Sequence, residues 1–254
     1  MARKPKIERF NEKVLSKFQI YNSLFLTLPF ENIKETSLFL PLFADACKMG
    51  YEENMKPNDI VTSFFSRYVP DFNAEQQKDL LFNFIQYIER QVVLFDAIED
   101  AGFSYVNNMH GRGTLRNFKE EASGKQLSET LSEYIKRFNV RIVLTAHPTQ
   151  FYPDNVLVII NELSSAIAKD DLDSIKKLLV QLGKTPFYKK EKPTPFDEAL
   201  SLIWFLENVF YHSASTIYDY IAEHIVDSNQ LENSIFDFGF WPGGDRDGNP
   251  FVTS

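Results

Sequence analysis

The stretch Val140-Arg141-Ile142-Val143-Leu144-Thr145-Ala146 decides the fold class of this 254-residue chain. It is short, apolar and rich in β-branched residues, and it has no helical period. These properties predict a buried β-strand in a chain that is otherwise patterned as helix. His147 and Pro148 follow the predicted strand at once. A neutral histidine at a strand end can act as acid, base or anion partner, although a structural histidine held by the turn is the simpler interpretation.

The sequence before this strand predicts only helices. The longest is expected over residues 74–100, where apolar residues three or four apart predict one buried face. These residues are Leu81, Phe84, Ile85, Ile88, Val92, Phe95 and Ile98. The remaining helices are expected at 8–28, 36–50, 58–68, 115–122 and 127–138.

After the strand, helices are expected at 155–168 and 171–182, followed by a loop with three prolines over 183–196. Thr194 or Asp197 could cap a long helix that runs to about Val226, with an apolar stripe from Leu200 to Ile221. A second short strand is expected at 236–241. Two strands separated by helices predict a parallel crossover, so the fold class is mainly α with two short parallel β-strands.

Composition places the chain among ordinary globular proteins. It is 44% hydrophobic and 24% charged, and its 10 glycines favour long helices over a turn-rich β fold. The net charge of -8 argues against a nucleic-acid partner. No apolar run reaches membrane-spanning length, and the single cysteine, Cys47, fits a reducing compartment. We therefore expect no membrane partner and a cytoplasmic location.

A second motif, Gly243-Gly244-Asp245-Arg246-Asp247-Gly248-Asn249-Pro250, follows the second predicted strand. Adjacent glycines let backbone N–H groups converge on an anion, and flanking carboxylates can orient the Arg246 guanidinium. A plain surface turn is an equally good interpretation. A calcium loop is not, because Pro250 stands where such a loop needs glycine. Trp241 precedes the motif and could pack in the core or wall a dry pocket.

The segments VLTAHPTQ (143–150) and WPGGDRDGNPFVT (241–253), with KPTPFDEA (192–199) between them, together resemble the phosphoenolpyruvate carboxylase family. The resemblance covers residues 140–254, whereas residues 1–139 resemble the family only in being helical. It implies that the chain is the N-terminal part of an elaborated (β/α)8 barrel. It also implies a helical region at 1–139 and the start of the barrel, with its first two strands, at 140–254.

The resemblance implies an activity as well: phosphoenolpyruvate and bicarbonate are converted to oxaloacetate and phosphate with Mg²⁺ or Mn²⁺. His147 would be catalytic, stabilising carboxyphosphate or taking its proton. Arg246, Asp245, Asp247, Gly243 and Gly244 would bind the anionic substrate, and Trp241 would help to form an apolar pocket for CO2.

The chain also departs from the family pattern. Pro153 stands where the family carries an arginine, and the metal-binding acidic residues belong to a later part of the family's chain. We therefore expect that the chain is an N-terminal fragment of a homo-oligomeric enzyme. Alone, this fragment is expected to be inactive and to bind no metal. A stand-alone helical module that binds a small anion, or a structural homologue that acts in assembly, are the alternatives.

Overall fold

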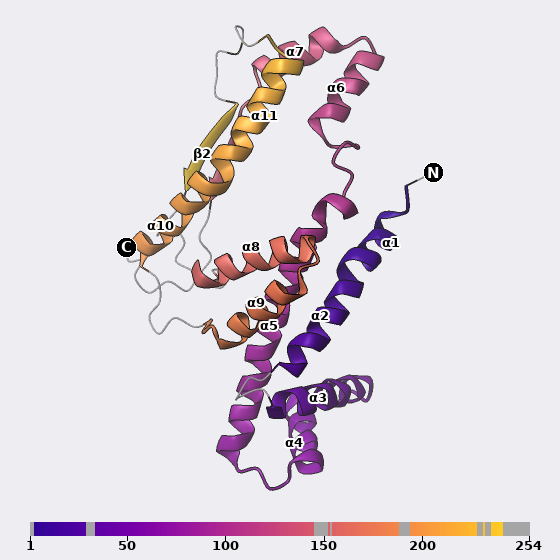
Figure 1. Cartoon of the computed structure of the whole chain (residues 1–254), viewed down its shortest axis with the longest axis vertical. Coiled ribbons are helices and arrows are strands. Elements are labelled where there is room, and N and C mark those ends of the chain that lie inside the picture. Colours follow the sequence, from indigo (N-terminus) through magenta and orange to yellow (C-terminus); the bar gives the residue numbers. More distant parts are fainter. Residues whose placement is uncertain are drawn as a thin grey trace. The chain divides into compact units, whose positions relative to one another are not determined.

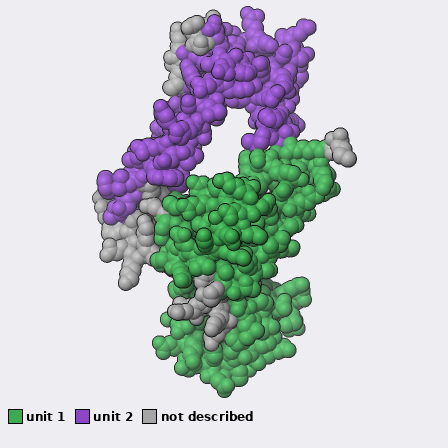
Figure 2. Space-filling model, in the orientation of Figure 1, with its two compact units in different colours: residues 1–107, 153–187 green, residues 108–152, 188–254 purple. Residues whose placement is uncertain are grey.

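The computed structural model describes residues 3–28, 34–144, 152, 154–187, 194–227, 231 and 235–240. The chain forms two compact units, coloured separately in Figure 2. Unit 1 comprises residues 1–107 and 153–187, and unit 2 comprises residues 108–152 and 188–254. The chain passes from one unit to the other at residues 107/108, 152/153 and 187/188, whereas the sequence predicted a domain boundary after residue 139. That boundary marks the expected start of a barrel and stays a prediction.

Among its described residues, unit 1 has helices as its regular secondary structure and no strand (Figure 1), as its apolar patterning predicts. Its elements are α1 (Lys6–Phe10), a π-helical turn η1 (Asn11–Leu15), α2 (Ser16–Thr27), α3 (Lys34–Glu52), α4 (Pro57–Tyr68), α5 (Ala74–Val106), α8 (Asp154–Ala168) and α9 (Leu172–Lys184). The six helices predicted in these regions are confirmed to within a few residues at most ends. The single helix expected at 8–28 contains the π-helical turn.

Helix α5 begins at Ala74, where its apolar spacing predicts a start, and Asn73 caps it. The Asn73 side chain accepts a hydrogen bond from the Gln76 backbone N–H at 2.9 Å, and the Gln76 side chain accepts one from the Asn73 N–H at 3.0 Å. This reciprocal capping box satisfies two backbone donors that the first turn leaves unpaired. The helix continues to Val106, six residues beyond the predicted end at residue 100.

The predicted buried face of α5 is wrong in part. Ile85, Ile88 and Val92 remain about half exposed, at 50%, 47% and 47%. The buried residues of the helix lie instead largely on a neighbouring stripe that includes Leu80, Phe84, Tyr87, Val93, Leu94, Ala97 and Ile98. The physical reason is that this 33-residue helix contacts α1, η1, α2, α3, α8 and α9 along its length. Several partners select its buried positions, so one apolar stripe does not define them.

Two arginines are buried in unit 1, and both bind helix ends. Arg90 donates hydrogen bonds to the backbone carbonyls of Leu182 (3.1 Å) and Thr185 (2.8 Å) at the end of α9, and to that of Gln86 (2.8 Å). Its guanidinium lies 4.7 Å from the centre of the Phe187 ring. Arg90 therefore joins α5 to the last turn of α9, whose carbonyls have no helical partner. Arg9 binds the Val106 carbonyl at the end of α5 in the same way.

Helices α3 and α4 pack so closely at Gly50 that a side chain there would collide with Ile60. A Cβ atom added at Gly50 would lie 2.5 Å from Ile60 Cδ1, and Ile60 is buried. We predict that Gly50→Ala lowers the free energy of unfolding by about 1–2 kcal/mol, because overpacking outweighs the helix propensity that alanine adds. Urea denaturation measures the change.

Gly124→Ala is the matched control for that experiment. Gly124 is the last residue of its helix, and a Cβ atom there would have no neighbour within 4 Å. We expect this variant to be as stable as the wild type or slightly more stable. Equal destabilisation by both substitutions would show that the contact with Ile60 is not the cause.

Unit 2 contains the two strands and the long helix that follows the proline-rich loop. Its elements are α6 (Leu115–Gly124), α7 (Ser128–Lys136), β1 (Val140–Leu144), α10 (Pro195–Phe205), a π-helical turn η2 (Leu206–Phe210), α11 (Tyr211–His224) and β2 (Phe236–Phe240). Its core cluster comprises Leu131, Ile135, Ile221, Val226 and Ile235. The predicted fold class, mainly α with two short parallel strands, is confirmed.

The helical run from α10 to α11 confirms the long helix expected after the loop. Thr194 is its N-cap: the Thr194 hydroxyl accepts a hydrogen bond from the Asp197 N–H at 3.3 Å, and the Asp197 carboxylate accepts from the Thr194 N–H at 2.8 Å. Its predicted apolar stripe is buried only toward the end. Ile221 is buried, whereas Leu200 and Ile203 are 50% and 38% exposed. The reason is that the unit 2 cluster contacts the second half of this run, and none of the described side chains of α10 belongs to the cluster.

Candidate active site

The two sequence motifs each follow the end of a strand, and the pairing of the two strands brings these ends together. β1 and β2 pair in parallel, with Val140 opposite Phe236 and Leu144 opposite Phe240. Both strands therefore end at the same edge of the two-stranded sheet. Adjacent strands in a sheet lie about 4.8 Å apart. TAHPTQ begins one residue after Leu144, and the segment WPGGDRDGNP begins one residue after Phe240.

The predicted site residues themselves lie outside the described residues. This holds for His147 in the first motif. It also holds for Trp241, Gly243, Gly244, Asp245, Arg246 and Asp247 in the second. Their convergence therefore stays a prediction. What the described residues add is the parallel pairing and register of the strands on which the prediction depends.

The two faces of the sheet differ in chemistry. On one face, the Phe238 ring contacts Phe210 of η2, with ring centres 5.6 Å apart, so a helix of the crossover covers this face. On the other face, Arg141 Nε donates a hydrogen bond to Asp237 Oδ2 at 2.6 Å, next to a half-exposed Val143. Arg141 and Asp237 are direct register partners. The sequence carries a signal for this ion pair, namely opposite charges near the start of both strands, which the motif-based prediction overlooked.

The other three histidines lie in a turn and on an exposed helix surface. His110 lies in the turn between α5 and α6, where Gly113 has a φ of 91° and the Thr114 hydroxyl caps α6 by accepting from the Asn117 N–H at 3.2 Å. The HGRGT segment is thus a turn that starts a helix. His212 and His224 lie on the exposed surface of α11.

No metal centre can be built from the residues that the structure describes. They contain no group of three or more histidine, cysteine, aspartate or glutamate side chains able to hold an ion. Cys47 is partly buried, and this burial raises the pKa of its thiol, so it stays protonated near neutral pH. Among the same residues, no helix is both long and apolar enough to span a membrane.

A parallel strand pair joined through helices, with polar motifs at the carboxyl ends of both strands, defines a chain of the βαβ class. The family model for phosphoenolpyruvate carboxylase matches residues 79–254, which is more than half of the chain. The chain belongs to the phosphoenolpyruvate carboxylase family. The match begins inside α5. The sequence similarity to the family therefore includes residues 79–139, for which the motifs predicted only a shared helical character.

Curated relatives agree with this assignment. The chain is 32% identical over 138 residues to a phosphoenolpyruvate carboxylase of Vibrio vulnificus strain YJ016, which covers 48% of this chain and 16% of the relative. It is 32% identical over 143 residues to the enzyme of Histophilus somni, covering 50% and 16%. For Acinetobacter baylyi the identity is 29% over 159 residues, covering 55% and 17%. The matches thus span only about a sixth of these relatives.

Proposed function

We propose that this chain forms the first two strands of a (β/α)8 barrel and the anion-binding part of a phosphoenolpyruvate carboxylase active site. The observation that carries the proposal is the parallel pairing of β1 with β2, which end opposite each other at Leu144 and Phe240. Active sites of such barrels lie at the carboxyl ends of the strands. Both family motifs follow these ends directly.

The two faces of the sheet suit the barrel proposal. Helices surround a (β/α)8 barrel on the outside, so the face that carries Phe238 against η2 would be the outer face. Arg141 and Asp237 would then lie inside the barrel near its amino-terminal end, where they can satisfy each other's charge. The motifs would lie at the opposite end, at the mouth of the barrel.

Within that site, each proposed role follows from the chemistry of a side chain. Arg246 would bind the phosphate or carboxylate of phosphoenolpyruvate, because its planar guanidinium can donate two parallel hydrogen bonds to such groups. Asp245 and Asp247 would orient that guanidinium, and backbone N–H groups at Gly243 and Gly244 would point toward the same anion. These groups together would neutralise an anionic substrate.

His147 would exchange the proton in the carboxylation. Attack of bicarbonate on the phosphoryl group gives carboxyphosphate and the enolate of pyruvate. The imidazole of His147 can take the carboxyl proton of carboxyphosphate, which then releases CO2 and phosphate. Trp241 would form an apolar wall that keeps CO2 beside the enolate and excludes water. The enolate carbon then attacks CO2 and gives oxaloacetate.

The Mg²⁺ or Mn²⁺ that the family resemblance implies finds no ligand set among the described residues, so we derive no step through it. We propose that residues beyond those described here supply the metal ligands in a longer carboxylase. A cytoplasmic location and a homo-oligomeric state are part of the same proposal, and they rest on the family resemblance.

We predict that the 254-residue chain alone forms no oxaloacetate from phosphoenolpyruvate and bicarbonate. The reason is that a single parallel strand pair supplies one part of a barrel site, and phosphoryl transfer needs charge neutralisation on all sides of the reacting group. Oxidation of NADH by added malate dehydrogenase, with Mg²⁺ or Mn²⁺ present, measures the product. Turnover that disappears in the variant His147→Ala would contradict the prediction.

The proposal itself is tested with a chimera, in which residues 79–254 replace the matching segment of the Vibrio vulnificus carboxylase. The same assay should detect oxaloacetate, since the replaced segment then meets the remainder of a barrel. A folded chimera, verified by circular dichroism and gel filtration, that forms no oxaloacetate would refute the proposed function.

A further inference from the structure

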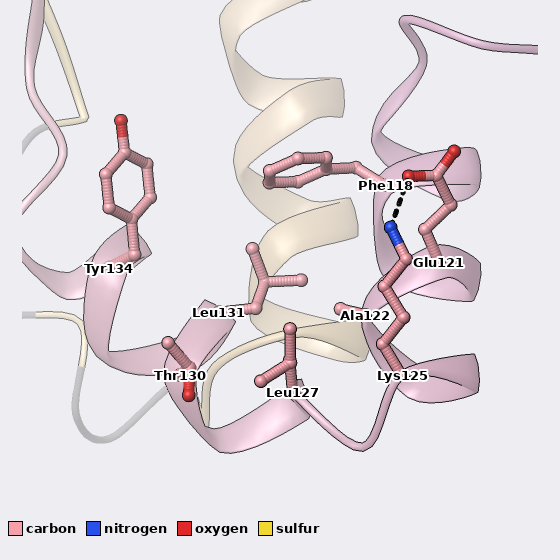
Figure 3. A pocket seen from close by; sticks show the side chains of 8 residues that line it. All are labelled: Phe118, Glu121, Ala122, Lys125, Leu127, Thr130, Leu131 and Tyr134. Carbon is pink, nitrogen blue, oxygen red and sulfur yellow. Dashed lines mark ion pairs between the residues drawn. The ribbon is translucent and has the colours of Figure 1, made fainter.

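A small apolar cavity lies in unit 2 between α6 and α7, apart from the strand ends. Its volume is about 270 Å³. Figure 3 shows the side chains that line it, which are Phe118, Glu121, Ala122, Lys125, Leu127, Thr130, Leu131 and Tyr134. Pockets for drug-sized ligands measure about 300–1,000 Å³. This cavity therefore fits something smaller, such as one aromatic ring or one branched aliphatic group.

The floor of the cavity is anchored in the unit 2 core. Leu131 is only 7% exposed and belongs to the same buried cluster as Ile221 of α11. A tight turn fixes the angle between the two helices: Gln126 has a φ of 59°, and the Leu127 N–H donates to the Ala122 carbonyl at 2.7 Å. Because the turn and the floor are held this way, the cavity is formed before any ligand binds.

The walls are apolar and open to solvent. Phe118, Leu127 and Tyr134 are 50%, 47% and 59% exposed. Leucine and aromatic side chains left exposed around a concave surface favour a ligand that covers them. An apolar ligand group in the cavity would remove these walls from water.

The rim carries one pair of opposite charges. Lys125 Nζ lies 3.8 Å from Glu121 Oε2, and both side chains are mostly exposed, at 68% and 55%. A pair this long and this exposed is weak, so either group can exchange its partner for a ligand charge. Lys125 can bind a carboxylate while Glu121 binds an ammonium group. A free α-amino acid carries these two charges on one carbon, next to its side chain.

We propose that this cavity binds a free α-amino acid with an aromatic or branched aliphatic side chain. The side chain enters between Phe118 and Tyr134, the carboxylate pairs with Lys125 and the ammonium group pairs with Glu121. With so few atoms, the ligand binds in the millimolar range. This site is independent of the proposed carboxylase activity, since none of its residues belongs to the family motifs.

The test is a titration of the 15N-labelled chain with amino acids, followed by NMR chemical shifts. L-Phenylalanine and L-leucine should produce saturable shifts confined to α6, α7 and the turn between them. Glycine, which lacks the apolar group, should produce none at the same concentration. Phenethylamine lacks the carboxylate, so it should bind at least about fivefold more weakly than phenylalanine.

Three variants complete the test. Thr130→Phe fills the cavity from an exposed position on α7 and should abolish the shifts. Lys125→Ala should weaken binding of phenylalanine at least about fivefold. Arg116→Ala is the matched control, because Arg116 forms a similar exposed pair with Glu120 at 3.3 Å on the same helix but does not line the cavity. It should bind phenylalanine as the wild type does.

Three results would overturn the proposal. The first is the absence of saturable shifts in α6 and α7 with phenylalanine and leucine, and the second is shifts that persist in Thr130→Phe. The third is equal binding of phenylalanine and N-acetylphenylalanine amide, which has neither charge. That third result would indicate that the cavity takes an apolar side chain of a peptide, with no role for Lys125 and Glu121.

Discussion

In the chimera, His147→Asn should lower kcat by about 10²–10⁴-fold and change KM far less. This is the usual contribution of a group that transfers a proton or stabilises charge in the transition state. Asparagine keeps a polar side chain of similar size but cannot exchange a proton near neutral pH. Steady-state kinetics at saturating bicarbonate measure both constants.

His212→Asn is the control for this substitution. His212 is exposed on α11, so the same chemical change there should leave kcat unaltered. A near-normal kcat of the His147→Asn chimera would indicate that His147 has only a structural role. A rise in KM with unchanged kcat would assign it to substrate binding instead.

Arg90→Met should lower the free energy of unfolding of the chain by about 3 kcal/mol. Methionine keeps much of the length of the side chain but donates no hydrogen bond. The carbonyls of Leu182 and Thr185 would then lose a charged donor in a buried place, since Arg90 is only 6% exposed. Contact of the guanidinium with the Phe187 ring is lost as well. Urea denaturation followed by circular dichroism measures the difference.

Two further variants separate the causes. Arg90→Lys keeps the charge but cannot reach both carbonyls at once, so it should recover only part of the loss. Arg67→Met changes an exposed arginine of α4 in the same unit and should alter stability by no more than about 0.5 kcal/mol. Equal free energies of unfolding for Arg90→Met and Arg67→Met would show that the hydrogen bonds of Arg90 do not stabilise the packing of α9 on α5.

Local signals in the sequence predicted the elements of the fold well. Thr194, one of the two cap candidates, starts the long helix, because its side chain satisfies a backbone donor that the first turn leaves unpaired. The apolar period predicted the start of α5 to the residue. The β-branched run at 140–144 predicted β1, and the helical crossover predicted its parallel pairing with β2.

The local sequence signals did not predict features that depend on tertiary contacts. Ile85 and Val92 have the spacing of a buried stripe, yet the partners of α5 contact other positions of the helix. Arg90 has the sequence appearance of a surface arginine, and only the approach of α9 buries it. Local chemistry singled out the two site motifs but left a structural histidine and a surface turn open, and only the resemblance to a family implied their roles. The pairing of β1 and β2 supplies the physical reason to expect the motifs side by side.

The central claim is that the segments after β1 and β2 form one site, with His147 and Arg246 acting on the same substrate. A double-mutant cycle in the chimera tests this most directly, with kcat/KM measured for wild type, His147→Asn, Arg246→Met and the double variant. Residues of one site are strongly non-additive, so the double variant should lose far less than the product of the two single losses. Losses that multiply would show that His147 and Arg246 act independently, and would contradict the account.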